Sequence, residues 1–182
     1  MSAQPVRLIL SVAGRFPRAP ALSSDENGVS AVPMIDVYAP AGVFADKHQL
    51  ARQVAAAVMA VGKVPDIAMF RENTAAFIHD LPRDAIANVD GGSHYVRVQV
   101  MTNAGALDRD KQIALASRLT EVIADAPGNP PPSERIWVLL TEAPEGGWGL
   151  WGHAHTNDEL IAAARREMAA ASRTDPGPSA TS

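Results

Sequence analysis

The sequence predicts an α/β fold in which duplicated β-α-β units form a four-stranded mixed sheet. Two helices cover one face of the sheet, and a further helix follows at the C-terminal end. Two observations carry this prediction. Segments with strand-like and helix-like hydrophobic periods alternate along the chain. The order strand, helix, strand also occurs twice, in residues 33–90 and again in residues 94–152. With only two copies, the pattern indicates a duplication and not a solenoid.

Composition excludes several classes of protein. The chain has 182 residues, of which 47% are hydrophobic and 20% charged, which suits one sizeable core or two small fused units. The absence of cysteine excludes disulfides, thiolate metal sites and a cysteine nucleophile. The net charge of −4 and the lack of a basic run argue against nucleic acid as a partner. No apolar run approaches the roughly 20 residues of a membrane helix, so we expect no membrane partner and a cytoplasmic protein.

The first unit begins at Pro33, a strand position at which no ladder N–H is yet needed. Side chains then alternate, which places Ile35 and Val37 on one face and Met34, Asp36 and Tyr38 on the other. An amphipathic helix is expected over 46–61, with Asp46 as N-cap, Gln49 three residues on, and Gly62 as the C′ residue. After a connection over 63–72, a short strand over 74–79 closes the unit, and the crossover makes its two strands parallel.

The second unit repeats this order. Residues 95–100 alternate strictly, with three valines on one face. Asp108 is expected to cap a helix whose apolar residues are Leu115, Leu119, Val122, Ile123 and Ala126. Residues 136–140 are nearly continuously apolar, which predicts a strand in the centre of the sheet. Beyond the repeat, Thr156 and Glu159 form a capping-box pattern ahead of an alanine-rich helix.

These elements divide the chain into four parts. Residues 1–32 are expected to be a disordered leader or an over-extended start, because their polar stretch buries little apolar surface. Residues 33–152 form the domain. Residues 153–171 form the C-terminal helix, and residues 172–182 form a disordered tail.

The sheet face away from the helices is expected to need a partner. Its residues are both polar and aromatic: Asp36, Tyr38, Arg97, Gln99, Trp137 and Leu139. A cyclic oligomer would bury such a face, so the chain is predicted to self-associate. Asp36 and Arg97 are placed to pair there, either within that interface or as a solvated surface pair that contributes little.

Three features together resemble the tautomerase superfamily: the leading proline, the duplicated unit, and residues 135–149, which read Arg-Ile-Trp-Val-Leu-Leu-Thr-Glu-Ala-Pro-Glu-Gly-Gly-Trp-Gly. The relatives are 4-oxalocrotonate tautomerase, cis-3-chloroacrylic acid dehalogenase, malonate semialdehyde decarboxylase and macrophage migration inhibitory factor. The resemblance covers roughly residues 33–152. It implies a homotrimer of two-unit subunits that acts, without a cofactor, as an isomerase on a small enolisable keto or enol compound.

The resemblance implies that Pro33 is the general base, with Trp137, Trp148, Arg97 and Asp36 as candidates for substrate binding. For both tryptophans, packing in the core or an interface is the alternative role. An N-terminal proline is a secondary amine, and an apolar pocket lowers its pKa so that it can accept a proton near neutral pH. An internal proline nitrogen is an amide and is not basic.

The sequence leaves two interpretations of Pro33 open. Translation that starts at Val32, through a GTG codon read as Met, would expose Pro33 once that Met is removed. Alternatively, the protein is a non-catalytic relative that serves as a binding or scaffold trimer. If another group is the base, His79 and Asp36 are the next candidates.

Arginines and histidines elsewhere in the sequence are further candidates for chemistry. Relatives that act on carboxylates carry arginines in the loop after a unit's first strand, but residues 39–44 and 101–106 contain none. Arg71 or Arg97 would have to substitute, or else they form salt bridges. His153 and His155, together with Asp158, could hold a metal ion. No third ligand is clearly placed beside the two histidines, however, so no metal site is expected.

Overall fold

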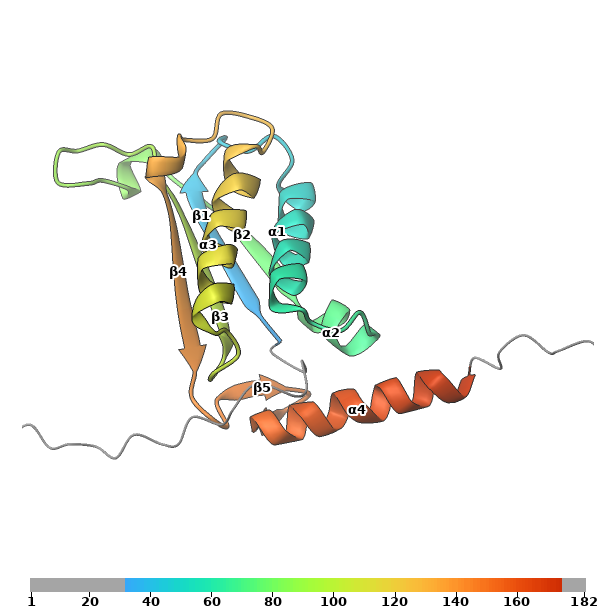
Figure 1. Ribbon diagram of the computed structural model, residues 1–182. Helices are drawn as coiled ribbons and strands as arrows, with labels where there is room; N and C mark the ends of the chain where they lie inside the picture. Colours follow the sequence, from blue (N-terminus) through green and yellow to red (C-terminus); the bar gives the residue numbers. More distant parts are fainter. Residues whose placement is uncertain (1–31, 175–182) are drawn as a thin grey trace, which may run out of the picture.

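The computed structural model of the chain describes residues 32–174 (Figure 1). The leader expected over 1–32 therefore lies outside the described residues, apart from Val32, and so do residues 175–182. Among the described residues, no helix combines the length and the apolar composition that crossing a lipid bilayer requires.

Four strands form one mixed sheet in the order β2-β1-β3-β4. They are β1 (Met34–Pro40), β2 (Ala75–Leu81), β3 (Val96–Asn103) and β4 (Ile136–Ala143). Within each unit the strands are parallel, β1 with β2 and β3 with β4, and the units meet through the antiparallel pair β1 and β3. Helices α1 (Lys47–Gly62) and α3 (Arg109–Ala124) lie side by side over one face (Figure 1). The predicted fold class is confirmed.

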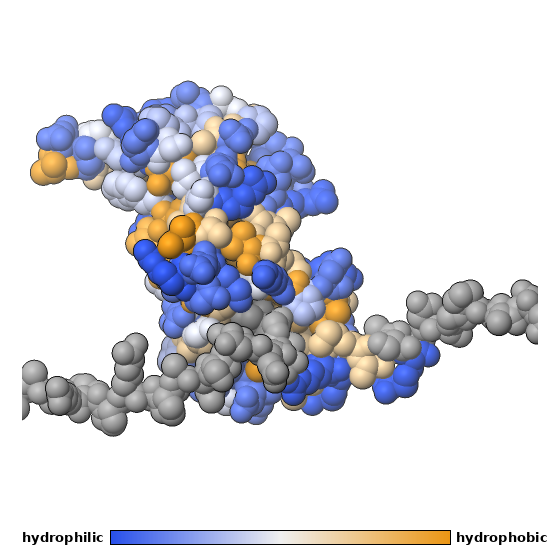
Figure 2. Space-filling view, viewed as in Figure 1, coloured by the Kyte–Doolittle hydropathy of each residue, from blue (hydrophilic) through white to orange (hydrophobic). Residues whose placement is uncertain are grey.

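The core lies between the sheet and these two helices. It is made of the alternate side chains of β1 and β3 and the apolar stripes of the helices, and the following are fully buried: Ile35, Val37, Val54, Val96, Val98, Val100, Leu115, Leu119 and Ile123. Burial of each such side chain contributes about 1.5–3 kcal/mol before entropy is counted. The helix-covered face is mostly hydrophilic on its outside, with an apolar band across the middle (Figure 2).

Strand β4 is an edge strand, so its predicted place in the centre of the sheet is wrong. Its apolar run arises because both of its faces carry apolar residues. Val138 and Leu140 pack against the core, whereas Trp137 and Leu139 are 50% and 43% exposed on the open face. A continuous apolar run therefore marks a strand with two apolar faces, and only one of them is covered within this chain.

The helix N-caps are confirmed. The Asp46 side chain accepts a hydrogen bond from Gln49 N at 2.9 Å, and that of Asp108 accepts one from Lys111 N at 2.8 Å. The C′ residue of α1, in contrast, is Lys63 (φ 55°) and not Gly62.

The bonds at this helix end explain why. Lys63 N and Val64 N donate to the carbonyls of Ala60 and Met59, which is the Schellman arrangement. It brings Val64 and Met59 into the same apolar cluster. If the helix ended one residue earlier, the charged Lys63 would take the place of Val64 there.

Several short elements were not predicted from the sequence. Helix α2 (Ala68–Asn73) lies inside the expected connection, and β5 (Trp148–Leu150) and β6 (His153–His155) form an antiparallel hairpin. Two single-turn 3₁₀ helices, η1 (Arg83–Ala85) and η2 (Ser133–Arg135), precede β3 and β4. Segments this short show no full hydrophobic period.

The C-terminal helix α4 (Asn157–Thr174) follows the hairpin, so it begins later than the expected residue 153 and extends past residue 171. Its predicted capping box is confirmed. Thr156 N donates to Glu159 Oε2 at 2.9 Å, and Glu159 N donates to Thr156 Oγ1 at 3.2 Å. Helix α4 runs across the end of the sheet at which β3 finishes (Figure 1).

Candidate active site at the end of the sheet

Val32 and Pro33 lie buried at the end of the sheet where β1 begins. Val32 is only 1% exposed and packs in a second apolar cluster, distinct from the main core. The other buried members come from α2, β4, β5 and α4: Met69, Phe70, Ala143, Trp148, Leu160 and Ala164. Val32 therefore fills an apolar space, here called the chamber, whose walls come largely from the C-terminal part of the chain.

Two neutral polar side chains lie at the same end of the sheet. Asn103, the last residue of β3, is 6% exposed, and its Oδ1 accepts a hydrogen bond from Val32 N at 3.2 Å. Thr74 is 8% exposed, and its hydroxyl is buried with no hydrogen-bond partner among residues 32–174. Because Met34 pairs with Ala75, the register places Thr74 beside Pro33. A buried unpaired hydroxyl costs roughly 1–3 kcal/mol, which marks this position as unusual.

Sequence reasoning missed Asn103 and Thr74. Their positions in the sequence could have indicated them, because Thr74 directly precedes a strand and Asn103 ends one. Only the sheet order shows that these ends meet, because β1 and β2 begin where the antiparallel β3 finishes.

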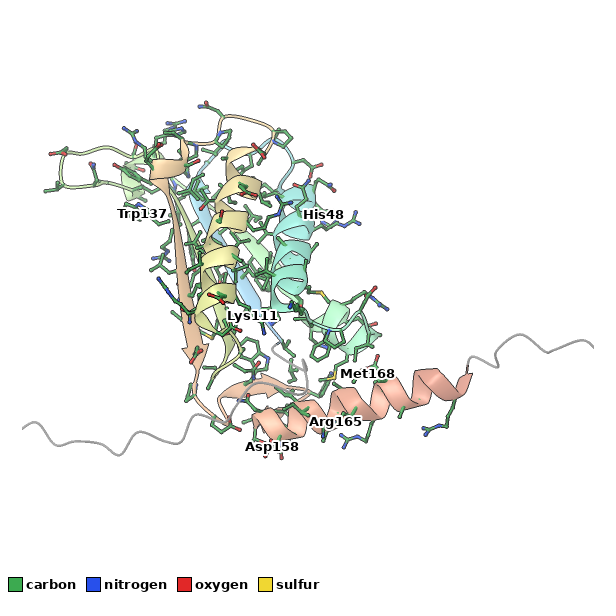
Figure 3. All side chains as sticks on the ribbon, in the orientation of Figure 1. His48, Lys111, Trp137, Asp158, Arg165 and Met168 are labelled. Carbon is green, nitrogen blue, oxygen red and sulfur yellow. The ribbon has the colours of Figure 1, made fainter. Side chains whose placement is uncertain are left out.

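The four residues predicted to bind substrate separate into two groups. Trp148 is 8% exposed and lies in the Val32 cluster. Trp137, Arg97 and Asp36 lie on the open face of the sheet, and Trp137 lies at the end of the sheet away from α4 (Figure 3). Within one chain, Trp148 is therefore the only member of this set beside the Pro33 segment.

The open face carries a stack of charged and aromatic groups. Arg97 lies over the Tyr38 ring at 4.3 Å, and that ring stacks on His79 with centroids 4.4 Å apart. His79 Nε2 is hydrogen-bonded to Asp36 Oδ1 at 2.6 Å. The expected Asp36–Arg97 pair therefore does not form within the chain. The register is the reason, because Arg97 stands opposite Tyr38 while Asp36 stands opposite Gln99.

Arg71 forms a salt bridge, which is the second of the two roles predicted for it. It lies on α2 and donates to Asp66 Oδ1 at 2.7 Å, and both side chains are exposed. The hydrogen bond and the charge of Asp66 raise the pKa of the guanidinium above its ordinary value. Such an exposed pair contributes little to stability.

The histidine pair meets a carboxylate other than the expected Asp158. His153 Nε2 lies 3.2 Å from Glu159 Oε2, whereas Asp158 is exposed at the start of α4 (Figure 3). The hydrogen bond from Thr156 N, and after it the bond with His153, lower the pKa of the Glu159 carboxyl. Glu159 is thus a carboxylate near neutral pH.

Comparison with known proteins supports this description. Residues 95–157 match the family model of the tautomerase enzymes. The fold resembles that of Pt0534, solved after inactivation by 2-oxo-3-pentynoate, with a TM-score of 0.58, 20% identity, and coverage of 69% of this chain and 96% of that one. A wild-type fused 4-OT described as an asymmetric trimer gives a TM-score of 0.56 at 22% identity, with 70% and 98% covered.

A member of the cis-3-chloroacrylic acid dehalogenase family gives a TM-score of 0.52 at 17% identity, with 77% of this chain and 96% of that chain covered. No curated protein matches the chain by sequence. The described domain thus has the tautomerase fold over both units, and the second unit also matches the family's sequence model.

Proposed function

We propose that the protein is a cofactor-free, tautomerase-like isomerase in which Pro33, as the mature N-terminal residue, is the general base. A free α-amino group has a pKa near 7.7–8.0, and an apolar environment lowers it by disfavouring the charged form. The chamber around the Pro33 segment supplies such an environment through Phe70, Trp148 and Leu160. The neutral amine can then move a proton between the carbon and oxygen of an enolisable carbonyl compound.

The apolar cluster next to Pro33 carries this proposal. In the described chain, Val32 fills the chamber and makes the Pro33 nitrogen an amide. A chain beginning at Pro33 would free the amine and, in the same step, empty the space that Val32 occupies. Asn103 and Thr74 would remain to hydrogen-bond a small carbonyl or enol in that space. Because both side chains are neutral, they suit a neutral carbonyl or enol oxygen. A substrate carboxylate would need a charged partner, and residues 39–44 and 101–106 contain no arginine to clamp one.

The alternative is a non-catalytic trimer that serves as a binding or scaffold protein. One observation favours it, namely that Val32 is fully packed and its N–H is already bonded to Asn103. In that case Val32 is a structural member of the apolar cluster, and Pro33 has no free amine.

Assembly as a cytoplasmic homotrimer belongs to both versions of the proposal. Phe77, Trp137 and Leu139 are 49%, 50% and 43% exposed on the open face, where they flank the Arg97–Tyr38–His79 stack. A face this apolar is typical of an interface. The trimeric description of fused 4-OT, which shares the fold, supports closure by three copies.

The decisive experiment compares a shortened chain, beginning Met-Pro33, with the full chain on the enol of a phenylpyruvate ester, which has no free carboxylate. Initiator Met is removed readily before proline, so the short form exposes the amine. We expect activity in the short form alone, rising with pH through one ionisation below the free-amine value because the neutral amine is the base. Pro33→Ala in the short form should lower the rate by roughly 10²–10⁴-fold. Pro82→Ala, at an exposed proline in a turn, is the matched control.

Each result discriminates between the candidates. Equal activity in both forms would show that Pro33 is not the base and would direct attention to His79 and Asp36. Mass spectrometry of the protein made from its native gene adds an independent test. An intact Met1 or Ser2 terminus there would contradict the catalytic version and leave the scaffold trimer.

A further inference from the structure

Three side chains outside the candidate active site gather where the β5–β6 hairpin meets α4. His153 and His155 are alternate residues of β6 and so lie on the same face of the strand. Glu159 belongs to the first turn of α4. One ligand atom from each of the three lies within 4.8 Å of the other two. His153 Nε2 and His155 Nδ1 lie 3.2 and 3.9 Å from Glu159 Oε2.

The hairpin backbone fixes the position of both histidines. Trp151 and Gly152 form its two-residue turn with φ of 52° and 76°, as in a type I′ turn. A tryptophan with positive φ is uncommon and needs support from its surroundings. Its ring packs edge-on against His155 with centroids 5.5 Å apart. Strand register thus holds the backbone of both histidines, and the packing of Trp151 also holds the His155 ring.

His155 has a defined tautomer. Its Nε2 lies 3.2 Å from the Leu150 carbonyl, which can only accept, so Nε2 carries the proton and Nδ1 presents a lone pair. This Nδ1 is buried and has no hydrogen-bond partner within the described part of the chain. The Glu159 oxygen at 3.9 Å is too distant and is itself an acceptor. A histidine that donates one ring N–H to a backbone carbonyl and offers the other nitrogen has the arrangement of a metal ligand.

We propose that His153, His155 and Glu159 bind a divalent transition metal ion, with Zn²⁺ as the best fit. Two imidazoles and one carboxylate form the three-protein-ligand set that zinc uses when its fourth position is open. Ligand atoms of a tetrahedral zinc site lie about 3.3 Å apart, so His155 Nδ1 must approach the carboxylate by roughly half an ångström. The ligand atoms lie up to 4.8 Å apart, and the His153 side chain, which is 59% exposed, can rotate to close the remaining gap.

The space beside the three ligands accommodates a fourth ligand. They line a groove of about 320 Å³ together with Trp151, Ala162, Ala163 and Arg166. Water or a small anion can enter this groove, and the guanidinium of Arg166 favours an anion. The proposed metal site does not depend on Pro33 and stands whether or not the protein is an isomerase.

The test uses the full chain without an affinity tag, in chelator-free buffer near neutral pH. Calorimetric titration with ZnCl₂ should give one zinc per chain, and titration with Co²⁺ should give the visible absorption bands of a site with fewer than six ligands. His155→Ala and Glu159→Gln should each weaken zinc binding by roughly tenfold or more. Glutamine can still accept from Thr156 N, so Glu159→Gln keeps the capping box and separates metal binding from helix stability.

Two matched controls define specificity. Asp158→Asn removes the neighbouring carboxylate, and His48→Ala removes a histidine at the far end of α1 (Figure 3). Both should bind zinc like the parent, and circular dichroism should show that all variants are folded. Absence of zinc uptake by the parent would overturn the proposal. A loss of affinity in Asp158→Asn equal to that in Glu159→Gln would also overturn it.

Discussion

The backbone N–H of Val32 donates to Asn103 Oδ1 across 3.2 Å inside the apolar cluster at the end of the sheet. Val32 precedes β1, so its backbone N–H has no place in the ladder of that strand, and the bond to Asn103 satisfies it. The same bond connects the residue before Pro33 to the end of β3.

Asn103→Ala in the full chain is expected to lower the free energy of unfolding by about 1–3 kcal/mol, because Val32 N–H then stays buried without an acceptor. Denaturant unfolding measures the change. Asn129→Ala is the control, because Asn129 is exposed and its recorded bond uses only its backbone N–H, so it should change stability by no more than about 0.5 kcal/mol. Equal effects of the two substitutions would contradict a buried role for Asn103.

Leu139→Lys is expected to disrupt assembly and leave the single chain folded. Leu139 is 43% exposed on the open face, halfway along the edge strand β4, so lysine is tolerated in the monomer but leaves a charge buried in an interface. Light scattering should give three chains of 19.2 kDa for the parent and a smaller species for the variant. Val89→Lys, at a residue that is 99% exposed in the loop before β3, should assemble like the parent. A monomeric parent at micromolar concentration would sink the assembly prediction.

Gly128→Ala is expected to be severely destabilising. Gly128 has a φ of 130°, and an added Cβ would lie 2.2 Å from the Val43 carbonyl oxygen. The surrounding strand-like contact, in which Ala45 N donates to Pro127 O at 2.8 Å, prevents the backbone from moving away. Gly91→Ala is the control, because φ is 82° there but nothing lies within 4 Å of the added atom. Thermal unfolding should show a much larger loss of stability for Gly128→Ala than for Gly91→Ala. Similar losses would mean that the positive φ, and not the contact with the Val43 carbonyl, causes the destabilisation.

Leu119→Ala should destabilise the protein by about 2–5 kcal/mol, because it removes a fully buried side chain between α3 and the sheet and leaves a cavity. Ile113→Ala on the same helix is the matched comparison, since Ile113 is 54% exposed and should cost far less. Both values come from denaturant unfolding. A cost below about 1 kcal/mol for Leu119→Ala would place the core elsewhere.

The sequence by itself determined the features that depend on neighbours along the chain. The alternation that begins at Met34, the caps Asp46 and Asp108, and the Thr156–Glu159 box were all predictable and are confirmed. Strand period and capping are local, because the groups that interact are separated by only two to four residues. The resemblance to the tautomerase superfamily rested on the same local order.

Only the tertiary structure decided which distant residues meet. Sheet order made β4 an edge strand, register gave Asp36 the partner His79 in place of Arg97, and the hairpin turn brought His153 and His155 to Glu159 instead of Asp158. The same order joined the ends of three strands around Val32, which placed Asn103 and Thr74 beside Pro33. Such contacts depend on strand neighbours and register, and a one-residue shift of register would turn every side chain of a strand to the other face.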